Sequence, residues 1–235
     1  MLPWIKSFKD FPPVDSARVE PNGLLCTGAD LAPQTIITAY SRGIFPWFSD
    51  DQPILWWSPN PRMVLFPDEF KVSKSLTKTV NRGVFDIRFD TAFGDVISAC
   101  AAPRRKDGGT WIVPEMQAAY TKLHALGVAH SAESWRDGKL VGGLYGLALG
   151  RMFFGESMFA RETDASKVAL VALVEKLKRE GFELIDCQQE TRHLASFGAR
   201  PIPRNQFVQR LAELIDLKQP KSAWQPTGLK VDVKT

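Results

Sequence analysis

The most regular hydrophobic pattern lies in residues 129–159, where apolar side chains alternate with polar or small ones in three successive runs. Asp137 and Gly138 separate the first two runs, and Gly150 separates the second from the third. An Asp-Gly pair between alternating runs is typical of a two-residue hairpin turn. We therefore expect a three-stranded antiparallel meander in this part of the chain.

Before and after the meander, apolar residues recur at the spacing of amphipathic helices. Pro114 suits the first turn of a helix that reaches Leu126. After the meander, the periods predict a long helix, a short strand and a last helix, over 165–180, 183–188 and 205–217. This order resembles the acyltransferase core of the GNAT type. It predicts an α+β fold in which helices flank a mostly antiparallel sheet.

The first half of the chain is less regular. Its first 28 residues show turn signals and no clear period, and residues 43–66 hold three tryptophans and four prolines, which exclude a long helix or strand. Short elements are expected elsewhere: a helix over 31–42 capped by Asp30, a helix over 74–82 capped by Ser73, a strand over 85–89, and a helix with Phe93, Val96, Ile97 and Cys100 on its apolar face. We predict a small mixed N-terminal α+β domain, residues 1–110, followed by a GNAT-like catalytic domain, residues 111–235.

Composition and charge exclude several classes of protein. Hydrophobic residues make up 44% of the chain and charged residues 24%, and no apolar run approaches the ~20 residues of a membrane span. The N-terminus lacks the apolar stretch of a signal peptide, so we expect a cytoplasmic protein that does not bind membranes. Three widely spaced cysteines and three histidines, with no CxxC pair, suggest neither disulfides nor a metal site.

The stretch before the long helix argues against acyl-CoA as the donor. In GNAT-type folds this stretch is rich in glycine, so that the backbone can approach the pyrophosphate of the cofactor. Residues 158–166 contain no glycine here, and Glu162 and Asp164 would repel a pyrophosphate. We expect a different acyl donor.

A basic helix and an exposed aromatic side chain favour a nucleic acid. Lys74, Lys78 and Arg82 are four residues apart and share one face of the predicted helix. A solvated basic face is the alternative explanation, but the spacing also suits phosphate contacts, with Arg104, Arg105 and Lys106 as a second contact. We expect Trp56 and Trp57 in the core, and Trp47 as an exposed platform on which a base could stack.

Several long motifs, in order, resemble the leucyl/phenylalanyl-tRNA–protein transferase family: GIFPWF, PILWWSPNPR, GTWI, VGGLYG, GESMF and DCQQETRHLASFGARPIPR. The resemblance spans about residues 21–204. It implies transfer of Leu or Phe from aminoacyl-tRNA to the N-terminal Arg or Lys of an acceptor protein, in the N-degron pathway. It also implies that neither ATP nor a metal is used, and we expect a monomer without a bound cofactor.

The matching motifs carry the residue roles of the family to this chain. The resemblance implies that Trp47 and Trp111, with Tyr40 nearby, lie at the 3′-terminal adenosine of the tRNA. Glu156 would join the hydrogen-bond network of the reaction site, with Asp186 and Gln188 as its central pair. The pocket for the donor side chain would be walled by Met158, Leu144, Leu170 and Leu173. The phosphate-binding helix of the family corresponds in spacing to Lys74, Lys78 and Arg82.

The strand pattern predicts how the polar site residues meet. Asp186 and Gln188 are two apart on their strand, so they are expected on one face, with Cys187 on the other. If this strand neighbours the one that carries Glu156, two carboxylates and an amide converge. We hypothesise that Gln188 accepts a hydrogen bond from the attacking amine, and that Asp186 either orients it or offsets its developing positive charge. A lone acid near a strand end more often caps or pairs, which is the alternative for each carboxylate.

Two other functions compete with the transferase. An acyl-CoA-dependent N-acetyltransferase would share the fold, but the acidic, glycine-free stretch opposes it. A non-catalytic RNA-binding protein would need only the tryptophan segment and the basic helix, and it leaves the convergence of polar side chains unexplained.

Overall fold

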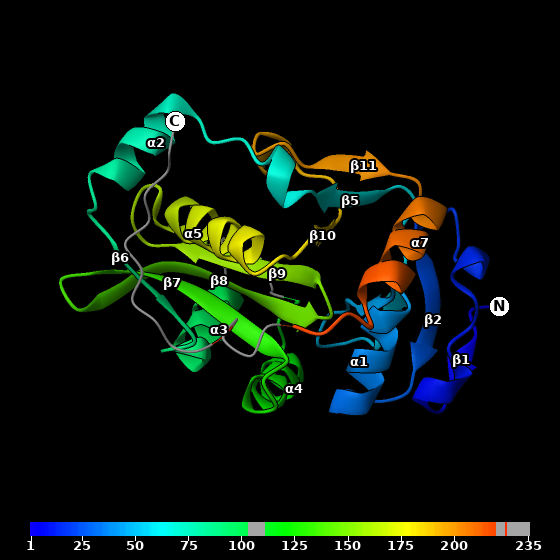
Figure 1. Cartoon of the computed structure of the whole chain (residues 1–235). Helices are drawn as coiled ribbons and strands as arrows, with labels where there is room; N and C mark the ends of the chain where they lie inside the picture. Colours follow the sequence, from blue (N-terminus) through cyan, green and yellow to red (C-terminus); the bar gives the residue numbers. More distant parts are fainter. Residues whose placement is uncertain (103–110, 220–223, 225–235) are drawn as a thin grey trace.

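A seven-stranded sheet forms the larger part of the molecule in the computed structural model, which describes residues 1–102, 111–219 and 224 (Figure 1). Its order is β11-β5-β10-β9-β8-β7-β6, and all neighbouring strands are antiparallel except β9 and β10, which are parallel. The bounds are β5 Arg62–Leu65, β6 Asp86–Phe89, β7 Ala129–Arg136, β8 Lys139–Leu149, β9 Met152–Ala160, β10 Leu184–Gln188 and β11 Arg200–Ile202. The predicted α+β fold with a mostly antiparallel sheet is confirmed.

Strands β7, β8 and β9 are the predicted meander. Asp137 and Gly138 both have positive φ angles, 50° and 73°, as a type I′ turn requires. Gly150, with a φ of 58°, turns the chain from β8 into β9. The local turn signals therefore set where these three strands begin and end.

Helices cover both faces of this sheet (Figure 1). On one face lie α5 Ala165–Arg179 and α2 Lys74–Asn81, and on the other α3 Phe93–Ala101 and α4 Pro114–Ala125. Strand β8 is buried on both sides, because Leu144 packs into the α5 cluster and Tyr145 into the α3 and α4 cluster. Helix α5 approaches so closely that a Cβ on Gly142 would lie 2.5 Å from the Cβ of Ala165.

A second sheet of four short strands, in the order β1-β2-β4-β3, forms from the N-terminal part. Its bounds are β1 Trp4–Ile5, β2 Leu24–Gly28, β3 Phe45–Pro46 and β4 Leu55–Trp57, with the short 3-10 helices η1 Phe8–Asp10 and η2 Val14–Ser16. In Figure 1, α1 Pro33–Ser41 and α7 Arg204–Leu214 lie between this part and the larger sheet. A further 3-10 helix η3 Pro67–Glu69 and a one-turn helix α6 Arg192–Ala195 complete the described elements.

The helix predictions hold, with two corrections to the N-terminal half. Ser73 caps α2 through its hydroxyl, as expected, but α1 starts after Ala32, and Asp30 instead accepts hydrogen bonds from the Ala32 N–H and the Thr35 hydroxyl. The segment 43–66, expected to be irregular, instead contains three short strands, β3, β4 and β5. Strands this short fit between the prolines, and β2 likewise occupies residues expected to be irregular.

The predicted domain boundary near residue 110 does not coincide with a division between the sheets. Strands β5 and β6 precede residue 110 and pair with strands that follow it. We propose that the boundary between the N-terminal unit, built on the four-stranded sheet, and the unit built on the seven-stranded sheet lies between β4 and β5. Within the described residues, no helix is long and apolar enough to cross a membrane.

Candidate active site

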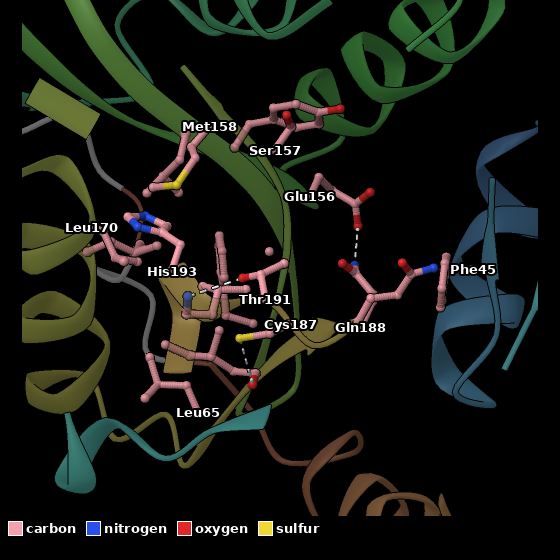
Figure 2. A pocket seen from close by; sticks show the side chains of 18 of the residues that line it. Phe45, Leu65, Glu156, Ser157, Met158, Leu170, Cys187, Gln188, Thr191 and His193 are labelled. Atoms are coloured by element: carbon pink, nitrogen blue, oxygen red, sulfur yellow. Dashed lines mark hydrogen bonds between the residues drawn. The ribbon is translucent and has the colours of Figure 1, made fainter. Parts of the chain in front are cut away.

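A cavity of about 590 Å³ opens where β9 and β10 separate. The parallel pairing of these strands ends with Asp186 opposite Phe154. Beyond this point, residues 155–158 of β9 and 187–189 after the pairing line the cavity. Figure 2 shows Glu156 and Gln188 together at one end and Met158 and Leu170 around the other. The cavity therefore has a polar end and an apolar end.

Both polar residues sit where the strand backbone is irregular. Gly155 and Ser157 pair with neighbouring residues of β8, so Glu156 is the extra residue of a β-bulge. Gln188 has a φ of 55°, in the left-handed region that non-glycine residues seldom adopt, and the register against β5 shifts at this point. Because of these irregularities, the side chains of Glu156 and Gln188 point toward each other, which they would not do on regular strands.

Glu156 is the centre of a hydrogen-bond network. Its Oε1 accepts from the Tyr40 hydroxyl at 2.7 Å and from the Gln188 side-chain amide at 3.2 Å, and its Oε2 accepts from the Tyr120 hydroxyl at 3.1 Å. The two tyrosine hydroxyls also lie 2.6 Å apart. Three neutral donors thus hold the carboxyl in one orientation.

The surroundings of Glu156 raise its pKa to about 7. Burial is the main cause, the hydrogen bonds from Tyr40 and Tyr120 oppose it, and the nearby Asp186 carboxylate adds to it. Burial and the Glu156 charge raise the pKa values of both tyrosines well above 10, so they remain protonated donors. Glu156 can therefore accept or release a proton near neutral pH.

Asp186 does not reach the cavity, contrary to the predicted convergence of two carboxylates and an amide. It is fully buried, and the Arg62 guanidinium donates to its two oxygens at 2.8 and 2.7 Å. Its Oδ1 also accepts the Gln188 backbone N–H at 2.9 Å. Because the chain turns at Gln188, strict alternation fails here, and Cys187, expected to face away, lines the cavity beside Gln188.

Arg62 is the partner that the sequence prediction missed. Its guanidinium is fully buried between the rings of Phe45 and Phe207, at 4.8 and 4.6 Å, and it also donates to the Gly43 carbonyl oxygen. A cation in the apolar run of β5 was the available signal, since a buried guanidinium needs an anionic partner. Tyr120 was also missed, because its place in α4 reads as an ordinary apolar position.

The apolar end of the cavity collects the four side chains predicted to wall a donor pocket. Helix α5 contributes Leu170 and Leu173, while β8 and β9 contribute Leu144 and Met158. Further apolar side chains of this wall include Leu65, Phe153 and Ile185. A cavity of this size and lining suits an apolar group of a small ligand.

Two tryptophans lie at the rim. Trp47 is 39% exposed, and both Trp47 and Trp111 line the cavity. Trp56 and Trp57 are buried, as expected, and the Trp57 indole donates to the Trp47 carbonyl oxygen at 2.7 Å. Tyr40 does not join this rim, because its side chain is fully buried and contacts Glu156 instead. A base can stack on Trp47 but not on Tyr40.

The predicted basic face of α2 is open to solvent in the structure. Lys74, Lys78 and Arg82 are exposed, while Leu76 and Val80 bury the other side of α2. Arg104, Arg105 and Lys106, named as a second contact, lie outside the described residues.

The start of α5 remains acidic in the folded chain. Glu162 pairs with Arg136 at 2.9 Å and Asp164 with Lys167 at 2.8 Å. These ion pairs offset the negative charge, but the stretch still lacks the glycines that would let the backbone approach a pyrophosphate. Acyl-CoA therefore remains a poor candidate for the acyl donor.

Two family models match the chain. One, described as leucyl/phenylalanyl-tRNA protein transferase, matches residues 64–212, and one described as the N-terminal domain of the same protein matches residues 29–60. Among curated proteins named leucyl/phenylalanyl-tRNA–protein transferase, one from Nitrosospira multiformis is 59% identical over 95% of this chain and 97% of its own. Another from Nitrosomonas eutropha is 58% identical over 95% and 96%.

Solved structures resemble the chain more distantly. The structure of L-PGS from Bacillus licheniformis is 14% identical, with a TM-score of 0.39, over 73% of this chain and 57% of its own. A likeness of this size carries no argument about function.

Proposed function

Because this chain belongs to the leucyl/phenylalanyl-tRNA–protein transferase family, we propose that it transfers Leu or Phe from aminoacyl-tRNA to proteins that begin with Arg or Lys. It is an aminoacyltransferase. We place the reaction in the cytoplasm, carried out by a monomer, as the step that prepares an acceptor for the N-degron pathway. The observation that carries the site assignment is the hydrogen-bonded pair of Glu156 and Gln188 at the polar end of an apolar cavity.

The cavity orients the donor by its two ends. The Leu or Phe side chain enters between α5 and the sheet, against Met158 and Leu170, while the terminal adenosine stacks on Trp47. This places the ester carbonyl near Glu156 and Gln188. A flexible methionine suits a pocket that accepts both a flat ring and a side chain branched at Cγ. Positioning of the two reactants then supplies much of the rate.

The chemistry is aminolysis of the ester. The acceptor α-amine attacks the carbonyl carbon, so a C–N bond forms while the bond from that carbon to the ribose oxygen breaks. Glu156 accepts the proton that the amine loses and returns it to the departing ribose oxygen, which leaves as a hydroxyl. A pKa of about 7 suits both transfers, and an α-amine with a pKa of about 7.7–8.0 is partly neutral at the same pH.

Gln188 positions the amine. Its amide nitrogen donates to Glu156, which leaves the side-chain carbonyl oxygen as an acceptor for an N–H of the attacking amine. Asp186 acts through Gln188, because it accepts the backbone N–H that holds this residue in its left-handed conformation. We therefore assign Asp186 and Arg62 as positioning residues.

The activity is tested with radiolabelled Phe-tRNA and two acceptors that differ only in an N-terminal Arg or Ala, with no ATP or CoA. Label on the Arg acceptor alone is the expected result. Equal labelling of both acceptors would remove the proposed specificity. Transfer that requires acetyl-CoA would overturn the donor assignment.

We expect Trp47→Ala to raise KM for aminoacyl-tRNA about 10- to 100-fold, because stacking on one aromatic ring contributes about 1–3 kcal/mol per base. Trp47→Phe should keep most of the affinity. Steady-state kinetics with Phe-tRNA measure both variants. Trp4→Ala is the matched control, since Trp4 is 67% exposed and does not line the cavity. A KM unchanged in Trp47→Ala would contradict the platform role.

We also expect the basic face of α2 to govern the salt dependence of tRNA binding. Replacing Lys74, Lys78 and Arg82 together by Gln should reduce the slope of log Kd against log salt concentration by about 2, since each phosphate contact contributes about 0.7–0.9. Filter binding between low and physiological salt measures this slope. The same change at the exposed cations Lys6, Lys9 and Arg18 is the control, and an equal effect there would indicate general charge only.

A further inference from the structure

One side chain that lines the cavity, Phe153, contacts an aromatic residue that does not line it. Phe153 is 1% exposed and lines the cavity, and its ring lies against Gly146, where a Cβ would come within 2.6 Å of the ring. On another side, the Phe153 ring stacks on the indole of Trp224, with centroids 5.9 Å apart and planes at 28°. Trp224 is not among the lining residues. Phe153 is therefore confined between the backbone of β8 and one aromatic neighbour.

Trp224 packs against several further side chains. Its indole stacks on His130 at 3.9 Å and 12°, meets the edge of Phe182 at 6.2 Å, and lies 5.6 Å from the Lys176 ammonium. His130 is 3% exposed and is bonded to Asp90 at 2.7 Å. Close-packed interiors transmit a change of volume to the next layer of side chains. Phe153 cannot retreat from the cavity while Trp224 occupies its place.

We propose that Trp224 is a specificity-determining residue for the donor amino acid, because it backs Phe153 and so sets the depth of the cavity. The inference rests on the proposed function of the cavity as the site of the Leu or Phe side chain. With Trp224 in place, the depth matches a leucyl or phenylalanyl group and rejects a larger indole. Removing the Trp224 ring leaves a void into which Phe153 turns, which deepens the cavity. Larger donor side chains then fit, while Leu loses contacts.

The test compares donors on one tRNA body acylated with Leu, Phe or Trp, with an acceptor that begins with Arg. In Trp224→Ala, we expect the ratio of kcat/KM for Trp to that for Leu to rise about tenfold, the scale on which apolar pockets discriminate by size. Adding Phe153→Trp to this variant refills the space and should return the ratio toward the wild-type value. A purely structural loss would lower transfer of all three donors together and leave the ratio unchanged.

Trp135→Ala is the matched control, since Trp135 is also a half-buried tryptophan at the same sheet and does not line the cavity. A wild-type ratio in a folded, active Trp224→Ala variant would overturn the inference and leave the transferase intact. If Trp224→Ala loses its fold by circular dichroism, Trp224→Leu and Trp224→Phe replace it, and the ratio should fall in the order of decreasing void. No transfer of Leu or Phe by the wild-type protein would overturn the proposed function itself, and this inference with it.

Discussion

Glu156→Gln is expected to lower kcat for Phe transfer at least about a hundredfold, because a positioned acid-base group contributes about 10²- to 10⁴-fold. The amide keeps the size of the side chain and can still bond to the hydroxyls of Tyr40 and Tyr120. It cannot take the proton from the amine. Single-turnover transfer measures the step directly. Glu190→Gln is the control, since Glu190 is an exposed acid close to the site that does not line the cavity.

The pH dependence of the transfer rate distinguishes an acid-base role of Glu156 from a purely structural one. In the wild-type protein, the rate should rise with pH through about 7 as Glu156 ionises, and again as the α-amine loses its proton. In Glu156→Gln, the component near 7 should vanish and the amine component remain. A Gln variant that keeps the component near 7 would show that another group titrates there.

The same shift makes a prediction about stability. A carboxyl whose pKa is raised in the folded state is protonated there while the unfolded chain is already ionised, so stability falls as pH rises from about 4.5 to about 7. Below pH 4.5, Glu156 does not lower the free energy of unfolding. Above pH 7 it lowers that free energy by its full amount, up to about 3 kcal/mol. Glu156→Gln should therefore unfold at higher urea than the wild type at pH 8 and at similar urea at pH 4.5.

The C-terminal half of the fold is predictable because its signals are local. The Asp137-Gly138 turn, the start of α4 at Pro114 and the alternation along β8 each depend on neighbouring residues only. Strands β3 and β4 are too short to show a period. The place of β5 between β10 and β11 depends on pairings with residues more than a hundred positions away. No local pattern encodes that pairing.

The sequence predicted most residues of the candidate site, but it missed Arg62 and Tyr120 and did not predict how the side chains are arranged. Motif resemblance named Glu156, Gln188 and the apolar wall, and all of these line one cavity. Strand alternation predicted Asp186 and Gln188 on one face. In the structure Gln188 is left-handed and lines the cavity, while the buried Asp186 carboxylate pairs with Arg62. Alternation assumes a regular backbone, and functional sites are where backbones depart from it.

The buried pair of Arg62 and Asp186 gives the last prediction. Arg62→Met should destabilise the protein by about 3–5 kcal/mol, because it leaves the Asp186 carboxylate buried without a cation. The double variant Arg62→Met, Asp186→Leu removes both charges and should recover most of that loss. Urea unfolding of the double variant and of the single variants Arg62→Met and Asp186→Leu measures the free energies, and their departure from additivity gives the coupling between the two residues.

The double variant also separates stability from activity. Its core is apolar and filled, yet the Gln188 N–H has lost the Asp186 oxygen that held it, so Gln188 is free to leave the left-handed conformation. We therefore expect a folded protein whose kcat stays low while KM for tRNA is near that of the wild type. Arg200→Met at the exposed Glu69 pair is the control and should change neither quantity appreciably. Full activity in the folded double variant would mean that Gln188 keeps its conformation without Asp186, and the pair would then serve only to join β5 to β10.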